Sequence, residues 1–152
     1  MGAGAGEVVS LTPYERVYID SMVFIYHFEG SPKYSPLTRR ILHMVESGRI
    51  KGVTSTLTVM EILVKPLRVA NTSAARDYVY LVTNFPGMVL RAVDVEVAEK
   101  ASELRAKYNI RAPDAIHVAT SIVEEADSFI TNDVRLQRID EVKVLLLNKL
   151  CE

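Results

Sequence analysis

Residues 50–68, IKGVTSTLTVMEILVKPLR, change abruptly from a pattern typical of a β-strand to one typical of a helix. The β-branched and apolar run 50–55 predicts a strand. Residues 56–68 are apolar on most of their helical surface and predict a buried helix with Pro66 near its end. Because a strand that leads directly into a helix is the unit from which parallel sheets are built, this stretch favours an α/β fold.

The same alternation continues on both sides of this stretch. Pro36, Gly48 and the pair Pro86-Gly87 interrupt it where elements are expected to begin or end. We therefore predict a single three-layer α/β/α domain over 13–150, with a mainly parallel five-stranded sheet, preceded by a flexible leader at 1–12. The predicted strands are 15–19, 50–55, 88–93, a fourth strand that together with its exit covers 127–133, and 142–147. The predicted helices are 21–28, 36–47, 56–68, 73–84, 94–108 and 113–126, with a helical turn at 134–139.

The composition excludes several classes of protein. Of the 152 residues, 49% are hydrophobic and 24% are charged, which suits one domain with a substantial core. The net charge of −1 gives no support to non-specific nucleic-acid binding, so a polyanionic partner would need a local basic patch. The single cysteine, Cys151, permits neither an internal disulfide nor a cysteine-based metal site. No apolar run approaches the roughly 20 residues of a membrane span, and no secretory signal opens the chain, so we expect a cytoplasmic protein.

Three aspartates occupy positions where a parallel sheet collects its ligands. Asp20 follows the first predicted strand, Asp133 follows the fourth, and Asp114 begins a helix in RAPDAIHVATS (111–121). Ligands bind at the carboxyl ends of parallel strands, so these acids are expected near one edge of the sheet. Taken singly, each also has an ordinary explanation, as a helix cap or as a favourable charge at a helix N-terminus.

Glu61 lies inside the helix predicted for 56–68. With Thr58, Lys65 and Arg68 it forms a narrow polar stripe. That stripe is either the wall of a cleft or a solvent-exposed face with a Glu61–Lys65 ion pair, and on this helix alone the exposed face is favoured.

The four acids considered together indicate a metal site. Carboxylates held close together repel one another, and loss of water makes the repulsion worse. A divalent cation with oxygen ligands removes the conflict, and Mg²⁺ or Mn²⁺ is the ion that suits carboxylates. His117, one turn after Asp114, is expected as a packed or hydrogen-bonded neighbour rather than a ligand. The basic residues most expected to flank a cleft are Lys33, Arg39, Arg40, Lys65, Arg68 and Arg76.

Four motifs in this order resemble the PIN domain family, and most closely the VapC-type toxin nucleases of VapBC toxin–antitoxin pairs. They are an apolar strand that ends in Asp-Ser, a glutamate within a helix, a Pro-Asp-Ala-Ile-His block and a strand that ends in Thr-Asn-Asp. The resemblance extends from about residue 15 to residue 147. The four motifs are YIDS (18–21), TLTVMEILVKP (56–66), PDAIHVAT (113–120) and ITND (130–133).

The resemblance implies a metal-dependent endoribonuclease that uses Mg²⁺ or Mn²⁺ and cuts single-stranded or looped RNA. It also implies a protein antitoxin and a homodimer. The Ser21 and Thr131 side chains would support the site. Met22 departs from the family, where asparagine or serine is common, so a supporting polar contact is not expected there. The acidic quartet that would hold the metal and catalyse the reaction is Asp20, Glu61, Asp114 and Asp133.

Two other functions were weighed. A phosphotransfer enzyme with an aspartyl nucleophile would need Asp-x-Asp after the first strand, and this chain has Asp20-Ser21-Met22. A PIN-like module that binds RNA or a protein without cleavage remains the alternative, because an intact quartet argues against it without excluding it.

Overall fold

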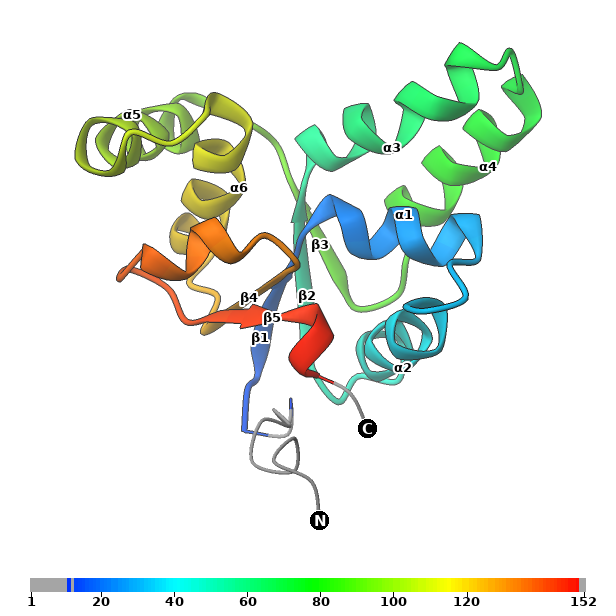
Figure 1. The fold of residues 1–152 in the computed structure, drawn as a ribbon, viewed down its shortest axis with the longest axis horizontal. Coiled ribbons are helices and arrows are strands. Elements are labelled where there is room, and N and C mark those ends of the chain that lie inside the picture. Colours follow the sequence, from blue (N-terminus) through cyan, green and yellow to red (C-terminus); the bar gives the residue numbers. More distant parts are fainter. Residues whose placement is uncertain (1–10, 12, 151–152) are drawn as a thin grey trace.

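The computed structural model describes residues 11 and 13–150, and its centre is a five-stranded sheet in the order β3-β2-β1-β4-β5 (Figure 1). All four neighbouring pairs of strands are parallel, as predicted. The strands are β1 (Arg16–Ile19), β2 (Lys51–Ser55), β3 (Met88–Arg91), β4 (Ser128–Thr131) and β5 (Val144–Leu146). The helices are α1 (Ser21–Glu29), α2 (Ser35–Glu46), α3 (Thr56–Arg68), α4 (Thr72–Thr83), α5 (Val95–Tyr108) and α6 (Ala112–Val123), with 3₁₀ helices η2 (Val134–Arg138) and η3 (Leu147–Lys149).

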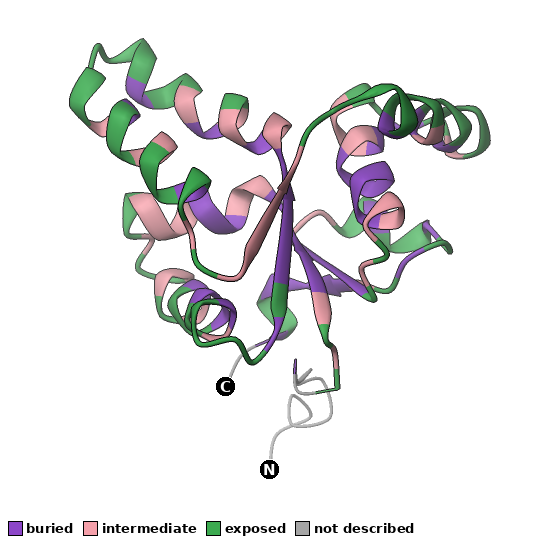
Figure 2. Ribbon diagram, turned by 180° about the vertical axis from the view of Figure 1, so that it is seen from behind, coloured by how far each residue is buried: buried purple, intermediate pink, exposed green. Residues whose placement is uncertain are grey.

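The helices cover both faces of the sheet, which gives the predicted α/β/α layers (Figure 1). Side chains alternate along β1: Val17 and Ile19 pack with α1, α2 and α3, while Tyr18 packs with α5 and α6. Period-two alternation places neighbouring side chains on opposite faces of a sheet. The central strands are buried on both faces as a result (Figure 2).

The central position of β1 determines where a site can form. Strand β2 lies on one side of β1 and β4 on the other, so the direction of the chain across the sheet reverses at β1. Such a switch point, at the carboxyl ends of the strands, is where open α/β sheets bind ligands. The residues that follow β1 and β4 therefore meet at this edge.

Element boundaries differ from the prediction mainly at the C-terminal ends. Helix α6 ends at Val123 instead of 126, because Glu125 adopts a left-handed conformation (φ 57°) that a helix cannot continue through. Strand β5 covers only Val144–Leu146 instead of 142–147, since η3 begins immediately after it.

Helix α3 was predicted to be buried, and this is wrong for one of its faces. Met60, Val64 and Leu67, which follow one another at helical spacing, are 56%, 41% and 55% exposed. Thr58, assigned by sequence to an exposed polar stripe, is fully buried and hydrogen-bonds to Thr54 across 2.7 Å. Helix α3 therefore presents apolar side chains to solvent on one side, while Thr58 is buried beside Ile62 and Pro66 on another.

The predicted leader at 1–12 lies outside the described residues, apart from Leu11, which is buried against the core. Among the described residues, no helix combines the length and apolar character needed to cross a membrane.

Candidate active site

Asp20 occupies the junction between β1 and α1 at the switch point. Its Oδ1 atom accepts a hydrogen bond from the Ser21 amide across 2.8 Å, which caps α1, and its Oδ2 atom accepts one from the Thr131 hydroxyl across 2.7 Å. The residue is only 6% exposed. Burial raises the pKa of the Asp20 carboxyl, although the charge of His117 and the Thr131 hydroxyl act in the opposite direction. Hydrogen bonds therefore hold the Asp20 carboxylate in place, but its neighbours compensate only in part for the cost of burying its negative charge.

Glu61 on α3 faces His117 on α6. The Glu61 Oε1 atom lies 2.7 Å from His117 Nε2, and the Tyr18 hydroxyl lies 2.6 Å from His117 Nδ1. An Nε2–H group donates to a carboxylate whether the ring is neutral with this tautomer or protonated. The Asp20 Oδ1 atom is 3.6 Å from the same Nε2. His117 therefore connects two acids of the predicted quartet, as a hydrogen-bonded neighbour of the kind expected from the sequence.

Asp133 follows β4 and is held in place by hydrogen bonds with residues two positions away on either side. Its carboxylate caps η2 by accepting from the Arg135 amide across 3.0 Å, and its amide donates to the Thr131 hydroxyl across 3.1 Å. The Arg135 guanidinium also clamps the carboxylate, with Nε 2.9 Å from Oδ1 and Nη2 2.6 Å from Oδ2. This guanidinium lowers the pKa of Asp133. Through one hydroxyl, Thr131 joins the Asp20 side chain to the Asp133 backbone.

Asp114 lies in the first turn of α6, where the helix dipole favours a negative charge. Its Oδ2 atom is 3.4 Å from the Arg111 Nε atom, in an ion pair that is mostly exposed on the arginine side. The Asp114 charge also contributes to raising the pKa of His117 and of Arg135. Asp114 therefore belongs to the same electrostatic neighbourhood as the other three acids.

The donor atoms at this edge suit Mg²⁺ or Mn²⁺ in kind, since they are carboxylate oxygens. The buried Asp20 carboxylate, whose pKa burial raises, is a group that a cation would stabilise. Within the part of the chain that the structure describes, however, no three His, Cys, Asp or Glu side chains are grouped so that they could hold a metal ion. The acids are instead paired with His117, Arg111 and Arg135.

The cations at the site differ from those expected to flank the cleft. Arg111 and Arg135 touch site carboxylates, whereas Lys65 pairs with Glu29 across 3.3 Å. The sequence did contain an indication, because Arg111 precedes Asp114 by three residues on one helical turn and Arg135 follows Asp133 by two.

Met22 also differs from expectation. Its sulfur atom lies 2.9 Å from the Asn132 amide and 3.9 Å from the Thr131 hydroxyl, so it acts as an acceptor where no polar contact was expected. A thioether is a weak acceptor, yet here it contacts the segment that carries Thr131 and Asp133.

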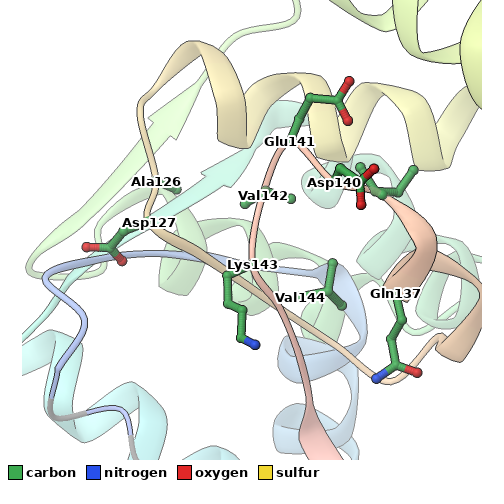
Figure 3. A pocket seen from close by; sticks show the side chains of 9 residues that line it. Ala126, Asp127, Gln137, Asp140, Glu141, Val142, Lys143 and Val144 are labelled. Atoms are coloured by element: carbon green, nitrogen blue, oxygen red, sulfur yellow. The ribbon is translucent and has the colours of Figure 1, made fainter.

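The pocket in Figure 3 lies elsewhere. It is an open hollow of about 580 Å³ near the amino ends of β4 and β5, the opposite edge from Asp20. Two of its acids have internal partners: the Asp127 carboxylate accepts from the Glu15 and Arg16 amides, and Glu141 pairs with Lys107. None of the four acids predicted from the sequence lines this hollow.

The sequence pattern of the PIN domain family matches residues 17–142, which is most of the chain. The chain is a member of the PIN domain family. No curated protein sequence gives a significant match to it. The fold of this PIN domain is similar to those of solved VapC-type toxins, at low sequence identity.

Three of these structures illustrate the similarity. VapBC2 from Rickettsia felis, bound to a promoter DNA fragment, has a TM-score of 0.69 at 12% identity and covers 86% of this chain and 98% of its own. A toxin–antitoxin complex from Klebsiella pneumoniae gives 0.67 at 19% identity, covering 86% and 97%. VapC20 from Mycobacterium tuberculosis, a toxin that cleaves the sarcin-ricin loop, gives 0.65 at 14% identity, covering 84% and 98%.

Proposed function

We propose that this PIN domain is an endoribonuclease that hydrolyses RNA phosphodiester bonds and depends on Mg²⁺ or Mn²⁺. The observation that carries the proposal is that Asp20 and Glu61, on different elements, both face the imidazole of His117 at the carboxyl edge of the sheet. The charge of Asp114 acts on the same imidazole, and the Asp133 amide shares the Thr131 hydroxyl with the Asp20 carboxylate. In this proposal the metal is held by Asp20, Glu61, Asp114 and Asp133.

A bound divalent cation would supply a water of lowered pKa and would stabilise the charge that develops on the phosphate. The chain itself would orient the groups. The Thr131 hydroxyl fixes the Asp20 carboxylate, and the His117 Nε2–H holds one Glu61 oxygen. Burial alone would raise the pKa of Glu61, but the hydrogen bond and charge of His117 and the Ser21 hydroxyl lower it. Glu61 is therefore ionised at neutral pH, which is the form that a cation would bind.

Asp114→Asn is the variant that tests this proposal. Among the described residues, Asp114 forms its ion pair with an exposed arginine, so its replacement should leave the fold intact. We expect the variant to lose Mn²⁺ binding by calorimetry and to lose cleavage of total RNA, with an unchanged circular dichroism spectrum. The matched control is Asp77→Asn, which removes the same charge from an exposed position on α4.

Three outcomes would overturn the nuclease proposal. These are cleavage by Asp114→Asn at the wild-type rate, cleavage that continues in EDTA, and failure of the wild-type chain to bind Mn²⁺. RNA binding without cleavage, unaffected by EDTA, would favour the alternative of a non-catalytic RNA-binding module.

The wider biological role that we propose is that of a toxin in a type II toxin–antitoxin pair, acting on RNA in the cytoplasm. Support comes from the fold, which is shared with proteins solved as toxin–antitoxin complexes. The exposed face of α3, with Met60, Val64 and Leu67, is apolar surface of the kind that protein partners cover. We propose an antitoxin and a second copy of this chain as the partners. Co-purification with the product of an adjacent short reading frame tests the first, and loss of RNA cleavage in the complex is the expected result.

A further inference from the structure

Two arginines form ion pairs with carboxylates of the proposed site. Arg135 clamps both oxygens of Asp133, and Arg111 Nε lies 3.4 Å from Asp114. The arginine side chains are 63% and 69% exposed, whereas each aspartate side chain is only 18% exposed. The acid is thus the inner member of each pair, and the guanidinium is the outer member that faces solvent.

Each guanidinium places a positive charge directly against one acid of the proposed site. The distances are 2.6 Å from Arg135 Nη2 to Asp133 Oδ2 and 3.4 Å from Arg111 Nε to Asp114 Oδ2. The two arginines therefore offset the charge of these acids in the absence of a metal ion.

These ion pairs compete with metal binding by the same carboxylates. The Arg135 guanidinium hydrogen-bonds to both oxygens of Asp133 and leaves a metal ion only their remaining lone pairs. A divalent cation would also repel a guanidinium held at the same carboxylate. If Asp114 and Asp133 bind the metal, this repulsion favours arginines that turn away, and their exposure leaves them free to do so.

We propose that Arg111 and Arg135 are exchangeable counter-ions that become the phosphate-binding residues of the substrate site. They neutralise Asp114 and Asp133 while no metal is bound, and once displaced they bind RNA phosphates beside the scissile bond. This inference rests on the proposed function and names the residues that contact its substrate. A guanidinium matches a phosphate as well as it matches a carboxylate, since both accept two parallel hydrogen bonds.

The proposal predicts that loss of either arginine changes the affinities for Mn²⁺ and for RNA in opposite directions. Removal of the Arg135 charge frees Asp133 and removes a repulsive cation, so Mn²⁺ should bind more tightly, by about threefold or more. The same change removes a phosphate contact, so RNA should bind about tenfold more weakly in Mn²⁺, with a salt dependence reduced by about one unit of slope. An arginine remote from both ligands would produce neither effect.

The experiment uses the full chain and the variants Arg135→Gln and Arg111→Gln. Mn²⁺ affinity is measured by calorimetry without RNA. RNA affinity is measured in Mn²⁺ by fluorescence anisotropy with a short 2′-O-methylated single strand, shown by gel to remain uncut. The matched control is Arg49→Gln, which makes the same charge change in the exposed turn before β2, at the opposite edge of the sheet. Its two affinities should stay within about twofold of wild type.

The expected result is tighter Mn²⁺ binding and weaker RNA binding in both test variants, with the control unchanged. Arg111→Gln provides an independent test if Arg135→Gln lowers the melting temperature, because Arg111 makes the longer and more exposed contact. The inference is overturned if Mn²⁺ affinity is unchanged or lower, or if RNA affinity equals that of Arg49→Gln. Those results, in a wild-type chain that binds Mn²⁺ and cleaves RNA, leave the nuclease proposal standing. A wild-type chain that does neither overturns both.

Discussion

His117 on α6 and Glu61 on α3 are joined by a 2.7 Å hydrogen bond that connects the helical layers on the two faces of the sheet. The other ring nitrogen of His117 is 2.6 Å from the Tyr18 hydroxyl on β1. One buried imidazole thus fixes a carboxylate of the proposed site relative to the central strand.

The stability of the metal-free protein should depend on pH through this histidine. Burial alone would lower the pKa of His117, but the hydrogen bond to Glu61 and the charges of Asp20, Glu61 and Asp114 raise it above the ordinary 6.5. Because the pKa of His117 is higher in the folded state than in the unfolded state, protonation of His117 stabilises the fold. This stabilisation is fully present below about pH 6.5 and is lost as the pH rises through the pKa of His117 in the folded protein. Urea unfolding in EDTA across this range should show the decline.

His117→Gln serves as the comparison for this pH effect. The variant keeps an amide donor near Glu61 but does not titrate, so the decline above pH 6.5 should be smaller than in wild type. An identical pH profile in the two proteins would show that His117 is not the group responsible.

Thr131→Val should impair the site with little change of shape. The substitution removes the hydrogen bond to Asp20 and the acceptor for the Asp133 amide. Loss of buried partners should lower the free energy of unfolding by about 1–3 kcal/mol. RNA cleavage at saturating Mn²⁺ should fall by about tenfold or more, since the Asp20 carboxylate is no longer fixed. Thr131→Ser keeps the hydroxyl and should retain most of the activity, and equal rates for the Val and Ser variants would contradict the assigned role.

Gly87→Ala should destabilise the fold without touching the site. Gly87 has φ 77°, and a Cβ atom there would clash with the Val45 carbonyl oxygen. Left-handed strain and this backbone clash together should cost about 2–4 kcal/mol, measured by urea unfolding. Gly30→Ala is the matched control, because Gly30 has φ 66° with no atom within 4 Å of the added Cβ. It should cost only about 1–2 kcal/mol, and equal losses for the two variants would show that the clash is relieved by movement of Val45.

Leu67→Lys tests the proposed dimer. Leu67 lies on the exposed apolar face of α3 with Met60 and Val64. A charge in the middle of a buried interface is costly, so the sedimentation coefficient should change from that of a dimer to that of a monomer. The control is Val134→Lys, since Val134 is 60% exposed but lies on η2, on the other side of the sheet. A wild-type chain that sediments as a monomer would contradict the dimer proposal directly.

Local features of the sequence were sufficient for the elements. The step from strand to helix at 55–56 and the cap formed by Asp20 appear in the structure where they were predicted. The Thr131 hydroxyl contacts the Asp20 carboxylate and the Asp133 amide, while the supporting role that the resemblance implies for it stays a prediction. Caps and periodicity depend on residues within one or two turns, so a single sequence displays them. The metal-binding role of the four acids remains a prediction.

Contacts between distant residues could not be obtained in this way. The bond between His117 and Glu61 joins residues 56 positions apart, and the bond between His117 and Tyr18 joins residues 99 apart. Both depend on the strand order and on the direction in which each helix crosses the sheet. The exposed face of α3 was missed because an apolar side chain has the same letter whether a neighbouring helix covers it or solvent does.

The sequence by itself determined the α/β alternation, the parallel sheet and the placement of the three aspartates at element ends, because these follow from short-range propensity and capping. It also contained the local pairs of Arg111 with Asp114 and of Arg135 with Asp133, whose members lie within one turn of each other. The tertiary structure alone decided that His117 stands between Glu61 and Asp20. These residues come from α6, α3 and the end of β1, so their side chains meet only when the whole sheet has assembled.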